Sequence, residues 1–103
     1  YVDAIDPDWV GEIHLAGHTA DPVYGDALLI DSHDQPVSEA VWQLHHRVVA
    51  RTGAVPTLIE RDGNLPPFAE LLDERDRAHR TLVASSAVAR DPRWCRAQDV
   101  MVA

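Results

Sequence analysis

Apolar and polar residues alternate along three stretches of the chain in the way that predicts extended structure. Residues 10–17 (VGEIHLAG) form one short run, in which Glu12, His14 and Ala16 face one side of a strand. Residues 55–60 (VPTLIE) give the clearest strand pattern, because a proline near the start of a strand is tolerated. Residues 27–33 (ALLIDSH) are a third extended candidate. The stretch before them, residues 18–26, is rich in Gly, Pro and Asp and predicts a loop.

Two amphipathic helices are predicted between and after these strands. The first covers residues 37–52, and it begins near Ser38 and ends at Gly53. Its predicted apolar face consists of Val37, Val41, Leu44 and Val48. The second runs from about residue 67 to residue 82 or beyond, and its predicted buried stripe consists of Phe68, Leu71, Leu72 and Leu82. Residues after about 89 are expected to form a tail, since Pro92 argues against further helix.

Strands that alternate with amphipathic helices predict an α/β fold built from βαβ units with a parallel sheet. A complete (β/α)8 barrel of the TIM type needs about 250 residues, whereas this chain has 103 and starts at Tyr1. We therefore expect the chain to hold the carboxy-terminal two βα units of such a barrel, incomplete by itself. On this interpretation residues 1–82 belong to the barrel, and residues 83–103 are a helix end and a carboxy-terminal tail.

The charge balance narrows the classes of partner. The net charge is −8, which argues against binding to nucleic acid or to an anionic membrane, because both need a basic face. No apolar run approaches the roughly 20 residues of a membrane-spanning helix. The single Cys95 cannot form an internal disulfide, so a reducing compartment and a cytoplasmic location are expected.

Side chains that can bind metals stand at or just after the carboxy end of each strand candidate. They are His14, His18, Asp31, His33 and Glu60. In α/β barrels this end of the strands carries the active site. Imidazole and carboxylate donors without a thiolate suit iron, manganese or zinc better than copper(I) or an iron–sulfur cluster. The sequence therefore predicts a metal site at this end of the strands, with its ligands among these five residues.

Each of these residues also has an ordinary structural interpretation. His14, between two apolar residues, could be a core histidine with a satisfied hydrogen bond, and Asp31 could be a turn or cap residue. Glu60 is the hardest to explain structurally, because a carboxylate on an apolar strand needs a partner or a metal. His45 and His46 fall in the middle of the first helix and are expected to be surface or packing residues.

Three stretches of sequence resemble the end of a known family. They are GEIHLAGH, LLIDSHDQPVSEAVWQL and PTLIERDGNLPPFAELLDE, in this order. Together they resemble domain-of-unknown-function family 692 (UPF0276), whose characterised members are multinuclear non-haem iron oxidases that modify cysteine residues in ribosomally made peptides, as in methanobactin biosynthesis. The resemblance covers about residues 1–82. Arg61 departs from the family pattern, in which a tryptophan is common at this position.

The resemblance implies a TIM-type barrel that holds two or three iron ions, with iron ahead of manganese or zinc. It implies that His14, Asp31, His33 and Glu60 are metal ligands, with His18 as a further candidate. It also implies a precursor peptide as substrate and a partner protein that binds the leader peptide. The family's other ligands come from earlier strands, so this chain alone is expected to be inactive. Two alternatives remain: a divalent-metal barrel of the isomerase or endonuclease type, or a non-catalytic fragment.

Overall fold

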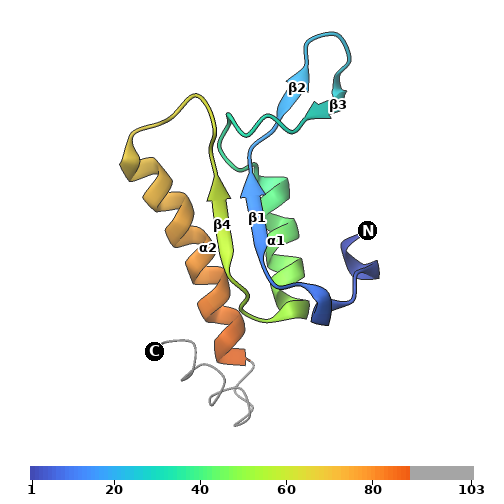
Figure 1. Cartoon of the computed structure of the whole chain (residues 1–103), viewed down its shortest axis with the longest axis vertical. Coiled ribbons are helices and arrows are strands. Elements are labelled where there is room, and N and C mark those ends of the chain that lie inside the picture. Colours follow the sequence, from blue (N-terminus) through green and yellow to red (C-terminus); the bar gives the residue numbers. More distant parts are fainter. Residues whose placement is uncertain (89–103) are drawn as a thin grey trace.

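Two parallel strands joined through a helix form the centre of the structure (Figure 1). The computed structural model describes residues 1–88. The elements, in chain order, are two short 3-10 turns at Val2–Ala4 and Pro7–Trp9, then β1 (Ile13–Ala16), β2 (Thr19–Asp21), β3 (Gly25–Ile30), α1 (Glu39–Thr52), β4 (Thr57–Glu60) and α2 (Phe68–Val88). The predicted order of strands and helices is confirmed, with the addition of one further strand.

Strands β1 and β4 pair in parallel, as the barrel interpretation requires. In their register His14 lies beside Leu58 and Ala16 beside Glu60. Both strands are shorter than the predicted 10–17 and 55–60. The pairing begins where the N–H of Ile13 donates to the carbonyl oxygen of Pro56, at 2.9 Å. The structure thus shows an α/β arrangement with one βαβ unit.

Helix α1 begins and ends where the sequence predicts. The Ser38 hydroxyl accepts a hydrogen bond from the N–H of Val41 at 3.3 Å, and Gly53 ends the helix with a φ of 77°. The buried residues of the helix are Trp42, His45 and Val49. The predicted face was wrong at Leu44, which is 46% exposed. The helix is turned so that the large Trp42 ring, instead of Leu44, reaches the core.

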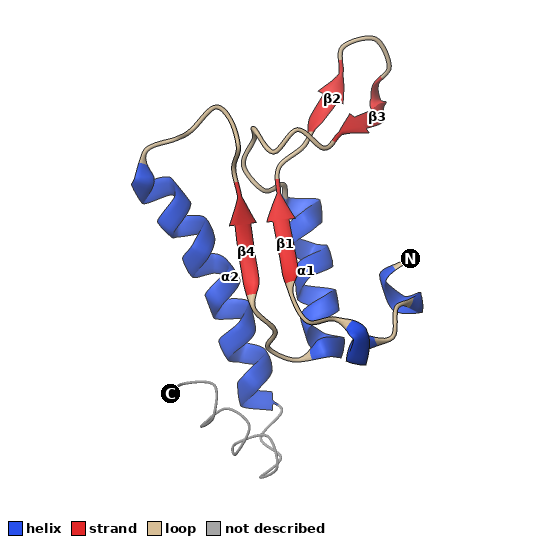
Figure 2. Ribbon diagram, viewed as in Figure 1, coloured by secondary structure: helices blue, strands red, loops and turns tan. Residues whose placement is uncertain are grey.

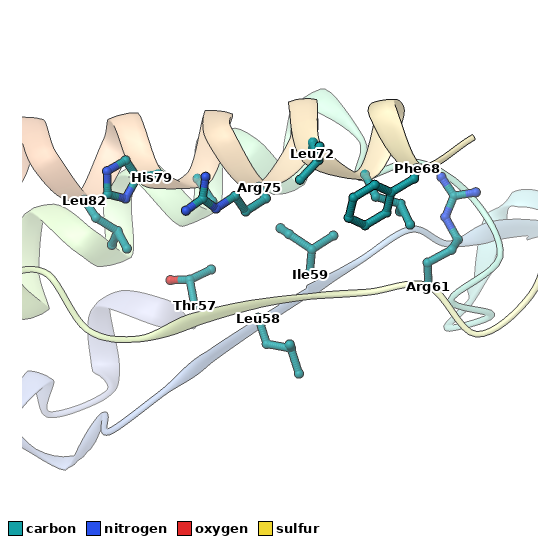
Figure 3. Close-up of a pocket in the computed structure, with 11 residues that line it drawn as sticks. Thr57, Leu58, Ile59, Arg61, Phe68, Leu72, Arg75, His79 and Leu82 are labelled. Carbon is teal, nitrogen blue, oxygen red and sulfur yellow. The ribbon is translucent and has the colours of Figure 1, made fainter. Parts of the chain in front are cut away.

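Helix α2 begins at Phe68, as predicted, and continues to Val88. Its predicted buried stripe is only partly buried, since Phe68 is 71% exposed and Leu72 is 42% exposed. Figure 3 shows that these two side chains face the edge of β4 near Ile59. They line an open groove instead of a closed core. The predicted tail from about residue 89, including Pro92, lies outside the described residues.

Strands β2 and β3 form an antiparallel hairpin that projects beyond the carboxyl ends of β1 and β4 (Figure 2). The predicted loop over residues 18–26 was therefore wrong at β2. The predicted extended run 27–33 was also wrong in its bounds, because β3 ends at Ile30. The turn is held by Asp21, whose carboxylate accepts from the N–H groups of Val23 and Tyr24 at 2.8 and 2.9 Å. This Asx-type turn allows a hairpin in a segment whose composition predicts a loop.

The hydrophobic core lies between the two-stranded sheet and the helices. Its buried residues are Leu15, Val37, Trp42 and Ala78. Ile13 and Ile59 pack against them from the strands. Because successive side chains on a strand point to opposite faces, His14, Leu58 and Glu60 lie on the face turned away from this core. That face is the one a closed barrel would enclose.

Candidate functional site

Glu60 and His14 meet at the carboxyl ends of the two parallel strands. His14 Nδ1 lies 2.7 Å from Glu60 Oε1, and His14 Nε2 lies 2.8 Å from Glu12 Oε1. The parallel register explains this contact, because it sets Glu60 beside Ala16, which shares a strand face with His14 and Glu12. The fold thus brings together two of the four predicted ligands through the pairing of β1 with β4.

His33 reaches the same carboxylate from the loop after the hairpin. Its Nδ1 lies 3.2 Å from Glu60 Oε2, and its Nε2 lies 2.8 Å from Asp31 Oδ1. Glu60 therefore bridges the two imidazoles, one on each oxygen. All four predicted residues, His14, Asp31, His33 and Glu60, form one connected group, which we call the Glu60 cluster. Asp31 is its outermost member, with a side chain that is 86% exposed.

Two further carboxylates, which were not among the predicted ligands, touch the cluster. Asp62 Oδ2 lies 3.3 Å from His33 Nδ1, and Glu12 contacts His14. Asp62 stands two residues after Glu60, and that spacing puts two side chains on one side of an extended chain. His18, the further candidate, is half-buried between β1 and β2. The Glu60 carboxylate is contacted by His14 and His33.

The carboxylates favour the charged form of both histidines. The hydrogen bond that Glu12 accepts from His14 has the largest influence on this imidazole. Together with Glu60 it raises the pKa of His14 above its usual value despite some desolvation. For His33, burial alone would lower the pKa, but Asp31, Glu60 and Asp62 together outweigh it, so the pKa is raised. Each ring faces carboxylate oxygens with both nitrogens, which requires an N–H on both in the absence of a metal. A metal ion would replace one of these protons on each ring.

The donor set fits a metal such as iron in its chemistry, since it offers imidazole nitrogens and carboxylate oxygens. The donor atoms around Glu60 are also close to the separation of about 3 Å that two ligands of one ion would have at metal–ligand distances near 2.1 Å. In residues 1–88, however, no three His, Cys, Asp or Glu side chains are arranged so that they could hold a metal ion. The cluster therefore supplies suitable donors without surrounding an ion.

A groove in the described structure lies away from the cluster. It has a volume of about 410 Å³ and runs between β4 and α2 (Figure 3). Its lining is largely apolar, with Arg61 and Arg75 as cationic groups and His79 as a further polar side chain. His14, His33 and Glu60 do not line it. The groove follows the unpaired edge of β4, so we do not assign it to the chemistry of the cluster.

Within residues 1–88, neither helix combines the length and the apolar character needed to cross a membrane.

Comparison with known proteins places the chain in a family. Residues 1–83 match the family described as RiPP precursor modification enzyme MbnB/TglH/ChrH. A UPF0276 protein of Caulobacter sp. (strain K31) is 53% identical over 87 residues, which are 84% of this chain and 31% of the relative. A UPF0276 protein of Bordetella bronchiseptica is 57% identical over 81 residues, which are 78% of this chain and 28% of the relative.

The chain spans about a third of the length of curated relatives that it matches. No solved structure matches it. The match nevertheless extends from Tyr1 through most of α2, so it includes every residue of the Glu60 cluster. The chain belongs to the family of peptide-modifying enzymes described as RiPP precursor modification enzyme MbnB/TglH/ChrH.

Proposed function

We propose that the chain is the carboxy-terminal part of an iron-dependent oxidase that modifies cysteine residues in a ribosomally made precursor peptide. The single observation that carries the proposal is the position of Glu60, whose two carboxylate oxygens contact His14 and His33 at the carboxyl ends of parallel strands. Membership of a family of precursor-modifying enzymes supplies the substrate class.

The architecture that goes with this proposal is a TIM-type barrel of which β1, α1, β4 and α2 are two βα units. Residues 1–82 would belong to the barrel, and residues 83–103 would be the end of α2 and a carboxy-terminal tail. The packing supports this arrangement, because Ile13, Leu15 and Ile59 pack in the core between the strands and the helices. The alternate residues His14, Leu58 and Glu60 face the other way. In barrels, active sites form at the carboxyl ends of the strands, where the Glu60 cluster lies.

In this proposal His14, Asp31, His33 and Glu60 hold iron, with two or three ions in the complete protein and further ligands from its other strands. Bound iron would supply the O₂-dependent oxidation of the substrate thiol. The contribution of the described residues is to fix the donors. Glu60 keeps the rings of His14 and His33 side by side, Glu12 holds the second nitrogen of His14, and Asp31 holds that of His33. A carboxylate on one ring nitrogen orients an imidazole ligand and determines that the other nitrogen binds the metal.

The partners in this proposal are a precursor peptide and a protein that binds its leader segment. The acidic balance of the chain, with a net charge of −8, supports a peptide partner over nucleic acid.

The test uses the full-length protein with His14→Ala and Glu60→Ala, and His46→Ala as the control, because His46 is exposed on α1. Bound iron is measured by elemental analysis, and the O₂-dependent mass change of a cysteine-containing precursor peptide by mass spectrometry. We expect both cluster variants to lose iron and activity while the control keeps both. Normal iron content and activity in both cluster variants would refute the assignment.

A further inference from the structure

Gly17, the residue directly after β1, lies very close to the backbone of the loop that carries His33. A Cβ atom at Gly17 would lie 1.9 Å from the carbonyl oxygen of Gln35 and 2.7 Å from that of Pro36. Real Cβ atoms essentially never approach other atoms more closely than 3.0 Å. Both contacts are with backbone atoms, which cannot rotate away as a side chain can. Any larger residue at position 17 must therefore push the segment 33–36 outward.

The need for glycine at position 17 is one of space and not of backbone conformation. The glycines with a left-handed φ are Gly25 and Gly53, at 55° and 77°. Gly11, on the other side of β1, provides the contrast, because a Cβ atom there would meet nothing within 4 Å. The structure thus leaves no room for a side chain at Gly17, directly after β1, but leaves room for one at Gly11, before it.

The backbone of His33 is tied to the ends of both strands. Its N–H donates to the carbonyl oxygen of Gly17 at 3.1 Å, and its carbonyl oxygen accepts from the N–H of Asp62 at 2.8 Å. His33 has a φ of 52°, a left-handed conformation that is sterically unfavourable for a residue with a side chain. Such a conformation persists only where the surroundings impose it. The two hydrogen bonds and the close approach at Gly17 are those surroundings.

Asp34 provides a second anchor for the same segment. Its Oδ1 accepts from the Ser32 hydroxyl at 2.5 Å and from the Thr19 hydroxyl at 2.9 Å. These two hydrogen bonds hold the pKa of the Asp34 carboxyl below its usual value. Arg61 donates weakly to the Asp34 carbonyl oxygen at 3.5 Å. The loop is therefore attached to β2 on one side and to the segment after β4 on the other.

We propose that Gly17 is a positioning residue for the Glu60 cluster: the space left by its missing side chain seats residues 33–36 against the end of β1 and so holds the His33 ring at Glu60. The inference rests on the proposed function in taking this cluster as the site. The contacts at Gly17 do not depend on a metal. The positioning role of Gly17 and the proposed iron-dependent function can therefore fail separately.

The experiment uses the full-length protein with 15N-labelled histidine, stripped of metal and kept at one pH. The NMR signals of the ring nitrogens report the carboxylate contacts of each imidazole. Glu60→Gln serves as the reference, because it removes the shared carboxylate from both His14 and His33. In Gly17→Ala we expect the His33 signals to move in the same direction as in the reference while the His14 signals stay at the wild-type positions. Gly11→Ala, the matched control, should leave both sets unchanged.

Iron content gives the second measurement. After reconstitution with ferrous iron, we expect Gly17→Ala to retain iron about tenfold more weakly than wild type, in the range that misplaced supports of metal ligands produce. His33 signals and iron retention both at wild-type values in Gly17→Ala would overturn the inference. If the wild-type protein binds no iron but the His33 signals still move in Gly17→Ala, the proposed function fails and the positioning role stands.

Should Gly17→Ala fail to fold, Asp34→Ala replaces it, because it removes the second anchor without adding volume. We expect its His33 signals to move in the same direction as in Glu60→Gln, with those of His14 retained. Unchanged His33 signals in Asp34→Ala would then overturn the inference.

Discussion

Glu60 Oε1 lies 2.7 Å from His14 Nδ1, although the two residues belong to different strands separated by a helix. The contact depends on a parallel register that sets Ala16 beside Glu60, so it is a direct consequence of the βαβ connection. Helix α1 supports that register from the opposite face of the strands, since its buried residue Trp42 shares a core with Leu15 of β1. The chemistry of the cluster is thus tied to the packing of the opposite face.

The barrel proposal predicts different costs for two equally exposed leucines. Leu58 and Leu44 are each 46% exposed in the described structure. Leu58 shares a strand face with His14, which a barrel would enclose, whereas Leu44 lies on α1 on the outside. In the full-length protein we expect Leu58→Ala to lower the free energy of unfolding by about 2–5 kcal/mol, as for a buried leucine. Leu44→Ala should change it by less than about 1 kcal/mol.

Urea unfolding of the two variants and the wild type measures both values. Leu15→Ala serves as the positive control, since Leu15 is 4% exposed in the core. Equal, small effects of Leu58→Ala and Leu44→Ala would show that the face of β4 that carries Glu60 stays open to solvent, which contradicts a closed barrel.

The sequence predicted the order of strands and helices well, because periodicity and caps are local signals. Ser38 and Gly53 marked the ends of α1 correctly. The side of α1 that is buried was harder to predict, because hydropathy treats His45 as polar. His45 is 2% exposed, lies edge-on to Trp42 and has Nε2 3.4 Å from the Thr57 hydroxyl. The Thr57 hydroxyl on β4 accounts for Nε2, whereas Nδ1 has no hydrogen-bond partner among the described residues.

The Glu60 cluster likewise combines local features that the sequence shows with contacts that depend on tertiary packing. Its four members could be predicted because each stands near the carboxy end of an apolar run. The contact partners could not, because they depend on the register between β1 and β4 and on the hairpin between His14 and His33. That hairpin was hidden by its composition, since Asp21 and Gly25 are typical loop residues. Its turn becomes visible only through the hydrogen bonds that Asp21 accepts.

The hairpin is expected to be the least stable part of the described structure. All six residues of β3 are exposed, and a two-stranded hairpin without further packing is marginal in water. Hydrogen exchange of the full-length protein should therefore show the amides of β2 and β3 exchanging much faster than those around Val49 in α1. Protection of β3 equal to that of α1 would contradict this expectation, because it would require another part of the protein to cover the hairpin.

His45 makes stability depend on pH in a defined direction. Burial, with a smaller contribution from nearby His46, lowers the pKa of His45 below its usual value of 6.5. The unfolded chain therefore binds a proton here at a higher pH than the folded protein does, so folding loses stability as the pH falls below about 6.5. His14 and His33, whose pKa values are raised, act in the opposite direction and partly mask the effect.

A substitution separates these contributions. His45→Gln keeps a polar side chain of similar size but cannot titrate, so its free energy of unfolding should fall less between pH 7 and pH 5 than that of the wild type. Urea unfolding at several pH values measures the difference. His79→Gln is the control, because His79 is exposed on α2 and does not act on the pKa of His45. An identical pH dependence in wild type and His45→Gln would show that His45 does not titrate differently on folding.

Glu12 offers a graded test of how the candidate ligands are supported. Its carboxylate lies 2.8 Å from Nε2 of His14, on the opposite side of the ring from Glu60. If His14 binds iron through the nitrogen that faces Glu60, Glu12 orients the ring through the other. Removing such a supporting carboxylate typically weakens metal binding by 10–100-fold, less than loss of a ligand. Glu12→Gln in the full-length protein should therefore retain some iron under conditions in which His14→Ala retains none.

Glu70→Gln, in the first turn of α2, is the control and should bind iron as the wild type does. Iron affinity in Glu12→Gln equal to that of the control would mean that the Glu12–His14 contact is a surface ion pair with no part in the site.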